Sequence, residues 1–473
     1  MPLHERLTRE IRQGPPGPKI AALFDLDQTL LAGFSAAAFF HERLLSGRMS
    51  PRELGESVLG ALSFTLGRTG FSGFVAATTA AYRGLAEEVM EEIGEEVFEK
   101  HLATAIFPES RALVRAHREM GHTLAIVSSA TRYQAEPLAR DLGIQHVLCT
   151  RLEVKDRVFT GRVEHPTCYG EGKAYAVIEL AQLHDLDLGE SYFYTDSHED
   201  LPLLDIVGRP RPLNPNGRLA QIAKERRWPV RRFKSRGTPS LGDVVRTGLV
   251  YGSLVPSIWA GAAAGLVNRS RREAINMLGS VWGDLATSLA GIDLRVEGEE
   301  HLWSHRPAVF IFNHQSALDA VLMLKLLRRD MTGVGKKEIQ RNPIFGPLFS
   351  AAGVVFIDRA DRAKAIEALT PAVEALRHGR SLAIAPEGTR SATPRLGRFK
   401  KGAFHIAMQA GVPIVPVVFR NVLDALPKGG LVVRPTTVEA VVLPPVDTSG
   451  WTRESLGGEI EAIHDRYLEV LEG

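Results

Sequence analysis

Apolar runs that end in polar motifs recur along this chain, and they predict the strands of parallel sheets. In the first half the runs are KIAALFDLDQT, HTLAIVSSA and SYFYTDS. In the second half they are PAVFIFNH, GVVFIDR, SLAIAPEGTR, VPIVPVVF and VEAVVLPPV. Strands that alternate with helices are typical of α/β folds, whose functional groups lie at the carboxyl ends of the strands. The pattern predicts two α/β units in tandem, with a helical insert between Gly33 and Phe107, where no such run occurs.

An uncharged stretch, Thr247–Asn268, separates the two sets of strands. It is long enough to span a bilayer, but basic clusters flank it on both sides, at Lys224–Arg236 and Arg269–Arg272. A spanning helix usually has positive charge on one side only. Charge on both sides favours a helix that lies in, or dips into, the anionic cytoplasmic leaflet of a membrane. The alternative is a buried helix, rich in alanine and glycine, in a soluble interface.

Composition narrows the class of protein. The 473 residues predict two or three domains, and 44% hydrophobic with 24% charged residues is ordinary for a soluble globular protein. A net charge of +2 gives no indication of nucleic-acid binding. The two cysteines, Cys149 and Cys168, form neither a disulfide framework nor a zinc motif. The amino terminus lacks the apolar region of a signal peptide, so we expect the protein to stay on the cytoplasmic side.

The first candidate site begins with two aspartates, Asp25 and Asp27, at the end of a strand. Residues i and i+2 of a strand face the same side, so the two carboxylates repel each other unless a cation or a shared proton lies between them. Mg²⁺ is a suitable cation, because it prefers oxygen ligands. Further polar residues end other strands or open a helix, namely Ser128, Lys173, Asp196 and Asp200.

Four motifs carry these residues: Asp25 with Asp27, then Ser128, then Lys173, then Asp196 with Asp200. In this order, the four motifs resemble the haloacid dehalogenase superfamily, in its phosphoserine-phosphatase-like branch. The resemblance covers about Lys19–Arg236 and implies a Rossmann-like domain with a helical cap. Two positions depart from the common pattern. Thr195 precedes Asp196 where glycine is frequent, and Asn214–Asn216 reads NPN where Asn-Pro-Asp is usual. The insert is rich in Ala, Leu and Phe. These residues either form the core of the cap or provide a surface for an apolar phosphate ester, so the sequence does not identify the substrate.

The resemblance implies a phosphomonoesterase mechanism. Asp25 would attack the phosphoryl group and form an aspartyl-phosphate. Asp27 would protonate the leaving oxygen and then activate water. Ser128 and Lys173 would bind the phosphoryl oxygens.

The same resemblance implies a magnesium site. Its ligands would be the side chains of Asp25 and Asp196 and the backbone carbonyl of Asp27, with Asp200 in a supporting place. The alternative is that this domain has no turnover and serves as a regulatory or scaffolding module.

The second candidate site follows the strand VFIF. His314 and Asp319 are five positions apart, which on one regular helix puts their side chains roughly 140° apart. They meet only if His314 precedes the helix and Asp319 lies within it. A histidine backed by a carboxylate is a general base. Later strand ends supply groups for an oxyanion such as phosphate: Arg359, Glu387, Gly388, Thr389 and Arg390.

This set of motifs resembles the glycerolipid acyltransferase family, in particular the 1-acylglycerol-3-phosphate acyltransferases, over about Leu294–Pro445. The resemblance implies that His314, oriented by Asp319, takes the proton of a glycerol hydroxyl, which attacks the thioester of acyl-CoA or acyl carrier protein. The five strand-end residues would form the region for the acceptor's phosphate, with Glu387 orienting basic groups or a hydroxyl there and not touching the phosphate itself. Lys336 and Lys337 either add charge there or form a solvated pair. No metal is implied in this half.

Together these expectations define the protein. We expect a tail at 1–18, a phosphatase-like domain at 19–236 with its cap at about 33–107, a basic and apolar linker with membrane-associated helices at 237–293, and an acyltransferase domain at 294–473. The expected product is phosphatidic acid, made from lysophosphatidic acid at the cytoplasmic face of an anionic membrane by a peripheral or monotopic protein. Glycerol-3-phosphate or another lysophospholipid is the alternative acceptor.

Overall fold

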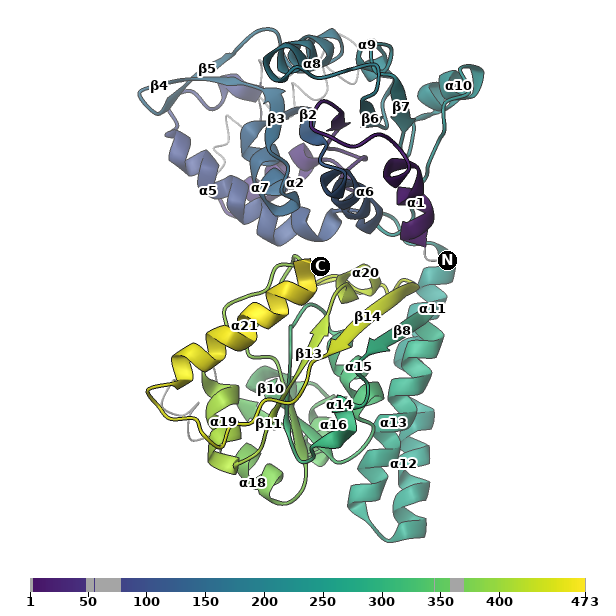
Figure 1. Cartoon of the computed structure of the whole chain (residues 1–473), viewed down its shortest axis with the longest axis vertical. Helices are drawn as coiled ribbons and strands as arrows, with labels where there is room; N and C mark the ends of the chain where they lie inside the picture. The colour runs from purple at the N-terminus through teal and green to yellow at the C-terminus, as the bar shows by residue number, and fades with distance from the viewer. Residues whose placement is uncertain (1–2, 48–54, 56–77, 344, 358–369, 473) are drawn as a thin grey trace. The chain divides into compact units, whose positions relative to one another are not determined.

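The computed structural model describes residues 3–47, 55, 78–343, 345–357 and 370–472. The chain divides into two compact units, Met1–Thr238 and Pro239–Gly473. Each unit has its own sheet of mostly parallel strands with helices packed on it (Figure 1). The expected α/β fold class is confirmed for both.

Five parallel strands form the main sheet of the first unit, in the order β3-β2-β1-β6-β7. The central strand, β1, is buried along its whole length, as the apolar sequence AALF requires of a strand covered on both faces. The strands of this unit, with an antiparallel hairpin of β4 and β5, are β1 (Ala21–Phe24), β2 (Thr123–Thr131), β3 (His146–Thr150), β4 (Leu152–Lys155), β5 (Val158–Val163), β6 (Tyr192–Thr195) and β7 (Arg209–Pro212). Its helices are α1 (Leu3–Arg12), α2 (Ser35–Leu45), α5 (Glu87–Val97), η1 (Phe98–Leu102), η2 (Ala103–Ala105), α6 (Pro108–Glu119), α7 (Arg132–Leu142), α8 (Glu171–His184), η3 (His198–Asp200), α9 (Leu201–Leu204) and α10 (Gly217–Glu225).

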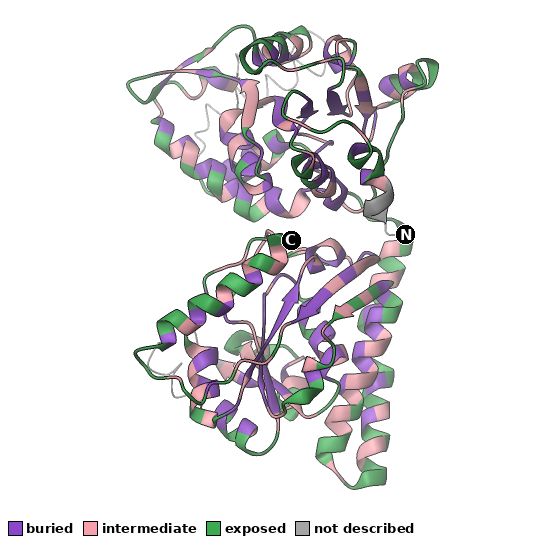
Figure 2. Ribbon diagram, in the orientation of Figure 1, coloured by how far each residue is buried: buried purple, intermediate pink, exposed green. Residues whose placement is uncertain are grey.

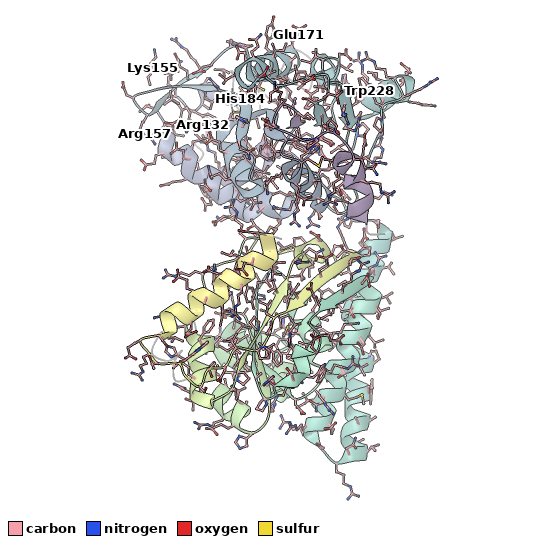
Figure 3. The ribbon with its side chains drawn as sticks, viewed as in Figure 1. Arg132, Lys155, Arg157, Glu171, His184 and Trp228 are labelled. Carbon is pink, nitrogen blue, oxygen red and sulfur yellow. The ribbon has the colours of Figure 1, made fainter. Side chains whose placement is uncertain are left out.

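The expected insert at 33–107 is built from helices where the structure describes it, since 48–54 and 56–77 lie outside the described residues. Ion pairs hold α5 against the rest of the unit. Glu91 pairs with Arg132 on α7 over 2.9 Å and with Arg157 on the β4–β5 turn over 3.3 Å (Figure 3). Glu87 lies next to the same two arginines. The insert is thereby tied to two elements of the main fold.

A polar network crosses the buried core of the first unit. His117 Nδ1 lies 2.7 Å from His122 Nδ1, and His117 Nε2 lies 2.8 Å from the hydroxyl of Tyr194. His122 Nε2 donates to the carbonyl of Pro15 over 3.0 Å, which leaves its Nδ1 as an acceptor when the ring is neutral. His117 then donates from Nδ1 and accepts from Tyr194. Two neutral rings satisfy every bond in the network.

The second unit contains a seven-stranded sheet in the order β11-β10-β12-β9-β13-β14-β8, in which only the β13–β14 pair is antiparallel. Side chains of β9 alternate between two cores. Val309 and Ile311 pack with α18, α19 and α21, and Phe310 and Phe312 pack with α13 and α15. Figure 2 shows the strands of this unit largely buried and its helices exposed on their outer sides. The strands are β8 (Ile292–Glu297), β9 (Val309–Phe312), β10 (Met331–Lys336), β11 (Val355–Ile357), β12 (Ser381–Ile384), β13 (Ile414–Phe419) and β14 (Thr436–Val442). The helices are α11 (Leu241–Gly252), α12 (Leu254–Asn268), α13 (Arg271–Ala290), α14 (His301–Ser304), α15 (Leu318–Leu327), η4 (Lys337–Arg341), α16 (Phe345–Ala351), α18 (Thr370–Arg377), α19 (Gly402–Ala410), α20 (Val422–Ala425) and α21 (Leu456–Glu472).

Helices α12 and α13 form an antiparallel hairpin that runs along one side of the second unit (Figure 1). The turn is made at Arg269, which has a left-handed backbone with φ 48°. Glycines let the two helices approach closely, because a Cβ at Gly261 would lie 2.7 Å from the carbonyl oxygen of Ala274. The stretch Leu241–Asn268 is long and apolar enough to cross a membrane, and only 28% of its most apolar window is buried.

Candidate active sites

The acidic residues predicted for the first site lie together at the carboxyl ends of β1 and β6. Lys173 on α8 bridges two carboxylates, with its Nζ 2.9 Å from Asp25 Oδ1 and 2.8 Å from Asp200 Oδ2. Asp27 Oδ1 accepts a bond of 2.7 Å from the main-chain N–H of Ser35, at the start of α2. All three carboxylates are part of one charged cluster, because these strands are parallel and their ends share one edge of the sheet.

The remaining predicted residues lie on the same edge. Asp196 directly follows β6, and its charge acts on the same cluster as that of Asp25. Ser128 is buried in β2, at the point where the pairing of β2 with β3 shifts register, and its Oγ accepts from the N–H of Ala130 over 3.2 Å. The NPN motif supports the edge from β7, since Asn214 Nδ2 donates to the carbonyl of Gln28 over 2.9 Å.

Two residues that sequence reasoning did not assign hold this cluster in place. The hydroxyl of Thr195, which is fully buried, donates to Asp200 Oδ2 over 2.6 Å. Gly172 precedes Lys173, and a Cβ there would lie 1.9 Å from the carbonyl oxygen of Thr167, so only glycine permits the close approach. The departure from glycine at position 195 was visible in the sequence, but the partner of its hydroxyl was not.

Burial and mutual repulsion act on the acid cluster. Burial raises the pKa of Asp25 to about 7 although Lys173 opposes the shift, and burial together with Asp25 and Asp200 raises the pKa of Asp196 to about 8. Burial also raises the pKa of Asp27, against the bond from Ser35. Burial alone would lower the pKa of Lys173, but the charges of Asp200 and Asp25 outweigh it and raise the value. The cluster holds more negative charge than one ammonium group neutralises.

This excess charge fits a divalent cation with oxygen ligands. In the described part of the chain, no three side chains of His, Cys, Asp or Glu converge into a metal-binding group. The expected ligand set asks for only two such side chains, from Asp25 and Asp196, and takes its third ligand from the backbone carbonyl of Asp27. The donor chemistry of the site is therefore compatible with Mg²⁺.

His314 and Asp319 of the second unit are in contact. His314 follows β9, and Asp319 lies in the first turn of α15, which is the strand–turn–helix arrangement that their spacing requires. His314 Nδ1 lies 2.7 Å from Asp319 Oδ2, and the same oxygen accepts from the N–H groups of Gln315 and Ser316 over 2.8 and 2.9 Å. Burial raises the pKa of Asp319, and the bond from His314 opposes the shift. A carboxylate acceptor fixes the proton on Nδ1, so His314 Nε2 is free to accept a proton.

The loop that carries His314 is fixed by bonds to two other strand ends. Asn313 exchanges two bonds with the main chain of Phe419, at the end of β13, over 2.8 and 2.7 Å. Glu387 Oε1 accepts from the N–H of His314 over 2.7 Å, and Glu387 Oε2 accepts from the N–H of Gly397 over 2.8 Å. Both oxygens of Glu387 thus bind main-chain groups. The acceptor-phosphate role expected for Glu387 stays a prediction.

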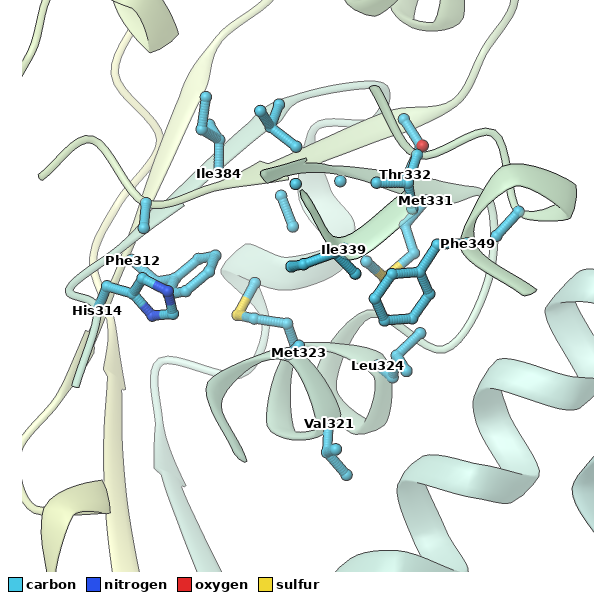
Figure 4. Close-up of a pocket in the computed structure, with 18 of the residues that line it drawn as sticks. Phe312, His314, Val321, Met323, Leu324, Met331, Thr332, Ile339, Phe349 and Ile384 are labelled. Atoms are coloured by element: carbon cyan, nitrogen blue, oxygen red, sulfur yellow. The ribbon is translucent and has the colours of Figure 1, made fainter. Parts of the chain in front are cut away.

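His314 opens onto a cavity of about 2010 Å³. Its side chain is 28% exposed, whereas that of Asp319 is fully buried, so a substrate can reach the imidazole but not the carboxylate. Apolar side chains from α15, β10 and α16 line much of the space, and Figure 4 shows Leu324 and Phe349 on the side away from His314, with Met323 between. The polar residues of the predicted phosphate region that line the same cavity are Gly388, Thr389, Arg390 and Lys336. The predicted residue Arg359 lies outside the described residues.

Two family models match the chain. Residues 22–205 match haloacid dehalogenase-like hydrolases, and residues 293–420 match the acyltransferases. A 1-acyl-sn-glycerol-3-phosphate acyltransferase of Limnanthes alba is 37% identical over 197 residues, which are 41% of this chain and 69% of that relative. A probable phosphatase of Mycobacterium tuberculosis is 33% identical over 229 residues, 46% of this chain and 77% of the relative.

Among solved structures, the 1-acyl-sn-glycerophosphate acyltransferase of Thermotoga maritima matches 48% of this chain and 97% of its own length, with 26% identity and a TM-score of 0.41. The sequence matches show that the chain is an enzyme with two domains. Its first half belongs to the haloacid dehalogenase-like hydrolases, and its second half belongs to the acyltransferase family that includes the 1-acyl-sn-glycerol-3-phosphate acyltransferases.

Proposed function

We propose that the second unit transfers an acyl group from acyl-CoA or acyl carrier protein to the free hydroxyl of 1-acylglycerol-3-phosphate, giving phosphatidic acid. The observation that carries this proposal is the contact of 2.7 Å between His314 and Asp319 at the wall of a large, mainly apolar cavity. An apolar cavity suits acyl chains, and the basic groups near Arg390 suit the acceptor's phosphate. Acylation of glycerol-3-phosphate or another lysophospholipid is the alternative that the same geometry permits.

In the proposed reaction His314 Nε2 takes the proton of the acceptor hydroxyl, and the oxygen attacks the carbonyl carbon of the thioester. The carbon–sulfur bond then breaks, and the departing thiolate receives the proton from the imidazolium. Asp319 keeps Nδ1 protonated and stabilises the imidazolium that forms in between. Gly388, Thr389, Arg390 and, outside the described residues, Arg359 are proposed to bind the acceptor's phosphate.

Replacement of His314 with alanine tests the assignment of the base. General-base loss typically costs ~10²–10⁴-fold, and we expect acyl transfer from acyl-CoA to lysophosphatidate to fall by that factor. His305→Ala, at an exposed histidine of the same unit, is the matched control and should change nothing. Activity of the His314→Ala enzyme within a few-fold of the wild type would contradict the proposal.

For the first unit we infer a phosphomonoesterase that works through an aspartyl-phosphate on Asp25. The supporting observation is the buried bridge from Lys173 to Asp25 and Asp200, which aims an ammonium group at the nucleophile. Asp27 is proposed to give a proton to the leaving oxygen, and Ser128 to donate to the phosphoryl group. Mg²⁺, held by Asp25, Asp196 and the carbonyl of Asp27 with support from Asp200, would neutralise phosphoryl charge.

Asp25→Asn tests this inference, because it keeps the size of the side chain and removes the nucleophile. We expect Mg²⁺-dependent release of phosphate to disappear, measured over a panel of small phosphate esters, lysophosphatidate and phosphatidate. Acyl transfer should stay near the wild-type rate. A wild type that releases no phosphate, combined with an Asp25→Asn variant that fails in acyl transfer, would favour the regulatory-module alternative.

We further propose that α11 and α12 hold the protein on the cytoplasmic face of an anionic membrane, as a peripheral or monotopic protein. The support is the exposure of large apolar side chains along these helices, including Trp259 at 72% and Leu266 at 80%. An exposed apolar face of this kind marks either a membrane or a protein interface, and the basic clusters on both sides of it favour the membrane.

A further inference from the structure

The helical insert of the first unit joins the main fold through two connections that pair with each other. The first connection follows Asp27, and the second precedes α6. The N–H of Ala32 donates to the carbonyl of Ala105 over 2.9 Å. The N–H of Phe107 donates to the carbonyl of Leu30 over 3.0 Å. The two connections therefore form a short ladder next to Asp27, the proposed proton donor.

A segment that follows α10 packs against the second connection. This segment, Arg231–Gly237, is called the strap below. Phe233 packs on Phe107 with ring centroids 5.6 Å apart. Arg236 Nε donates to the carbonyl of Thr104 over 3.0 Å. The strap thus holds the point where the insert returns to the main fold.

Asn214, which follows β7, ties the strap to the first connection. Its Nδ2 donates to the carbonyl of Gln28 over 2.9 Å, and its Oδ1 accepts from the N–H of Phe233 over 2.6 Å. Gln28 directly follows Asp27 and has a left-handed backbone, with φ 57°. Residues other than glycine keep such a backbone only where their surroundings hold it. The bond from Asn214 contributes to that hold.

The loop that starts at Gln28 leads to the group that binds Asp27. The N–H of Gln28 donates to the carbonyl of Gly33 over 3.2 Å and closes the loop. Two residues further on, the N–H of Ser35 donates to Asp27 Oδ1 over 2.7 Å. A shift of this loop would therefore move the carboxylate of Asp27. The match to the hydrolase family ends at residue 205, before Asn214 and the strap.

We propose that Asn214 and the strap are positioning elements of the first site, which hold the two connections together and thereby direct Asp27 at the leaving oxygen. This inference rests on the proposed phosphomonoesterase, in which Asp27 gives its proton to that oxygen. Proton donation matters most for esters whose leaving group is a strong base. A displaced Asp27 should therefore slow the cleavage of phenyl phosphate more than that of p-nitrophenyl phosphate, because p-nitrophenolate departs without a proton.

These two esters, which differ little in shape, test the positioning role in the full-length enzyme. Asn214→Gly removes the amide and suits the left-handed backbone of this position, with φ 46°, and Arg236→Ala removes the bond to Thr104. In both variants kcat/KM should fall about tenfold or more for phenyl phosphate and about twofold or less for p-nitrophenyl phosphate. The matched controls are Gln221→Ala and Arg226→Ala, at surface pairs of the same unit, and they should change neither value.

Backbone hydrogen exchange tests the holding role without turnover or metal. Peptides that cover 26–36 and 102–108 should exchange about fivefold faster or more in both variants than in the wild type, and the β4–β5 hairpin should not change. Unchanged exchange in these peptides would show that the strap does not hold the connections. Equal losses on both esters would overturn the positioning of Asp27.

The failure of the proposed function has a different signature. A wild type that releases phosphate from neither ester would refute the phosphomonoesterase and the positioning role with it. Faster exchange in the two variants would still establish that Asn214 and the strap hold the two connections.

Discussion

The carboxylate of Glu387 accepts a hydrogen bond of 2.7 Å from the main-chain N–H of His314, and this bond joins the end of β12 to the end of β9. The N–H of Ser391 closes the same junction by donating to the carbonyl of His314 over 2.8 Å. The proposed base is therefore positioned by the loop that also carries Gly388 and Arg390, which are proposed to bind the acceptor. A change in either loop should alter the distance between the proposed base and the proposed phosphate site.

Glu387→Gln should lower kcat for acyl transfer about 10- to 100-fold with little change in the KM for lysophosphatidate. The amide replaces one acceptor oxygen with a donor, so one buried main-chain N–H, of His314 or Gly397, loses its partner at a cost of ~1–3 kcal/mol. Steady-state kinetics with both substrates varied measures the effect. Glu374→Gln, at an exposed glutamate of α18, is the control. A raised KM with an unchanged kcat would instead place Glu387 on the acceptor's phosphate.

Asp319→Asn should reduce kcat/KM for acyl transfer ~10²–10⁴-fold while the protein stays folded. An amide in place of the carboxylate no longer fixes the proton on His314 Nδ1 and leaves the imidazolium unstabilised. The control is Asp284→Asn, which removes a carboxylate on α13 that pairs with Arg328 at the surface. Thermal melting of both variants checks the fold. An Asp319→Asn enzyme with nearly full activity would remove the aspartate from the mechanism.

Thr195→Val should impair phosphate release, and Thr195→Ser should restore most of it. Valine keeps the shape of the side chain but removes the hydroxyl that donates to Asp200 over 2.6 Å, so Asp200 and Lys173 lose a fixed position. We expect kcat to fall about tenfold, because a buried acceptor loses a partner. The serine variant distinguishes loss of the hydrogen bond from a change in packing. If serine is as impaired as valine, packing of the methyl group matters and the hydrogen bond does not.

Both sites show what the sequence could and could not predict. The strand-end positions of Asp25, Asp196, His314 and Glu387 were predictable, because apolar runs mark buried strands and the residues after them share one edge of a parallel sheet. The spacing of His314 and Asp319 even required a turn before the helix. The strand order of the second sheet, with β8 paired to β14 at its far edge, was not predictable from local patterns.

Long-range bonds between side chains and the main chain were equally invisible to pattern reasoning. Asn313 binds the main chain of Phe419, and Glu387 binds the N–H of His314, across long stretches of sequence. Every residue has main-chain N–H or C=O groups, so the sequence does not indicate which of them a side chain will bind.

The contribution of the His117–His122 network to the stability of the first unit should fall as the pH decreases below ~6.5. Burial, with His122 and Arg211, lowers the pKa of His117 well below its ordinary value, and burial with Arg209 lowers that of His122. These two histidines therefore bind more protons in the unfolded chain than in the folded chain in this range. Their contribution is constant above the unfolded pKa of ~6.5 and decreases below it, by up to about 1.4 kcal/mol per pH unit for His117. The raised pKa values of Asp25 and Asp196 act with the opposite sign, so the histidine contribution is measured as a difference between wild type and variant.

Hydrogen exchange measured by mass spectrometry checks this prediction in the full-length protein. As the pH falls from ~7 to ~5, peptides that contain β1 and β6 should lose more protection in the wild type than in a His117→Gln variant, after correction for the intrinsic rate. His184→Gln, at an exposed histidine on α8, should leave the slope unchanged. The same profile in the wild type and in His117→Gln would show that the His117–His122 network accepts a proton without opening the fold.

The Trp259→Ala/Leu266→Asp variant should bind anionic liposomes at least about tenfold more weakly than the wild type. The two side chains are among the most exposed apolar groups of α12, and burial of each in lipid contributes ~1.5–3 kcal/mol. Sedimentation with liposomes measures the bound fraction. Leu183→Asp replaces an equally exposed leucine, at 78%, on α8 of the first unit and serves as the control. Unchanged binding would favour a soluble interface for α12.

The left-handed turn at Arg269 also determines how the chain would be arranged relative to a bilayer. Helices α12 and α13 run antiparallel from that turn, so the chain that goes in along one helix comes back along the other. Arg269 stands at the tip, while Arg271 binds the carbonyl of Ala351 and Arg272 pairs with Asp330 on the body of the unit. A crossing would carry charged groups through the hydrocarbon at a high cost in free energy. The proposed membrane-binding hairpin would therefore lie along a single leaflet, with Arg269 exposed to the lipid phosphates and its start and end facing the same aqueous compartment.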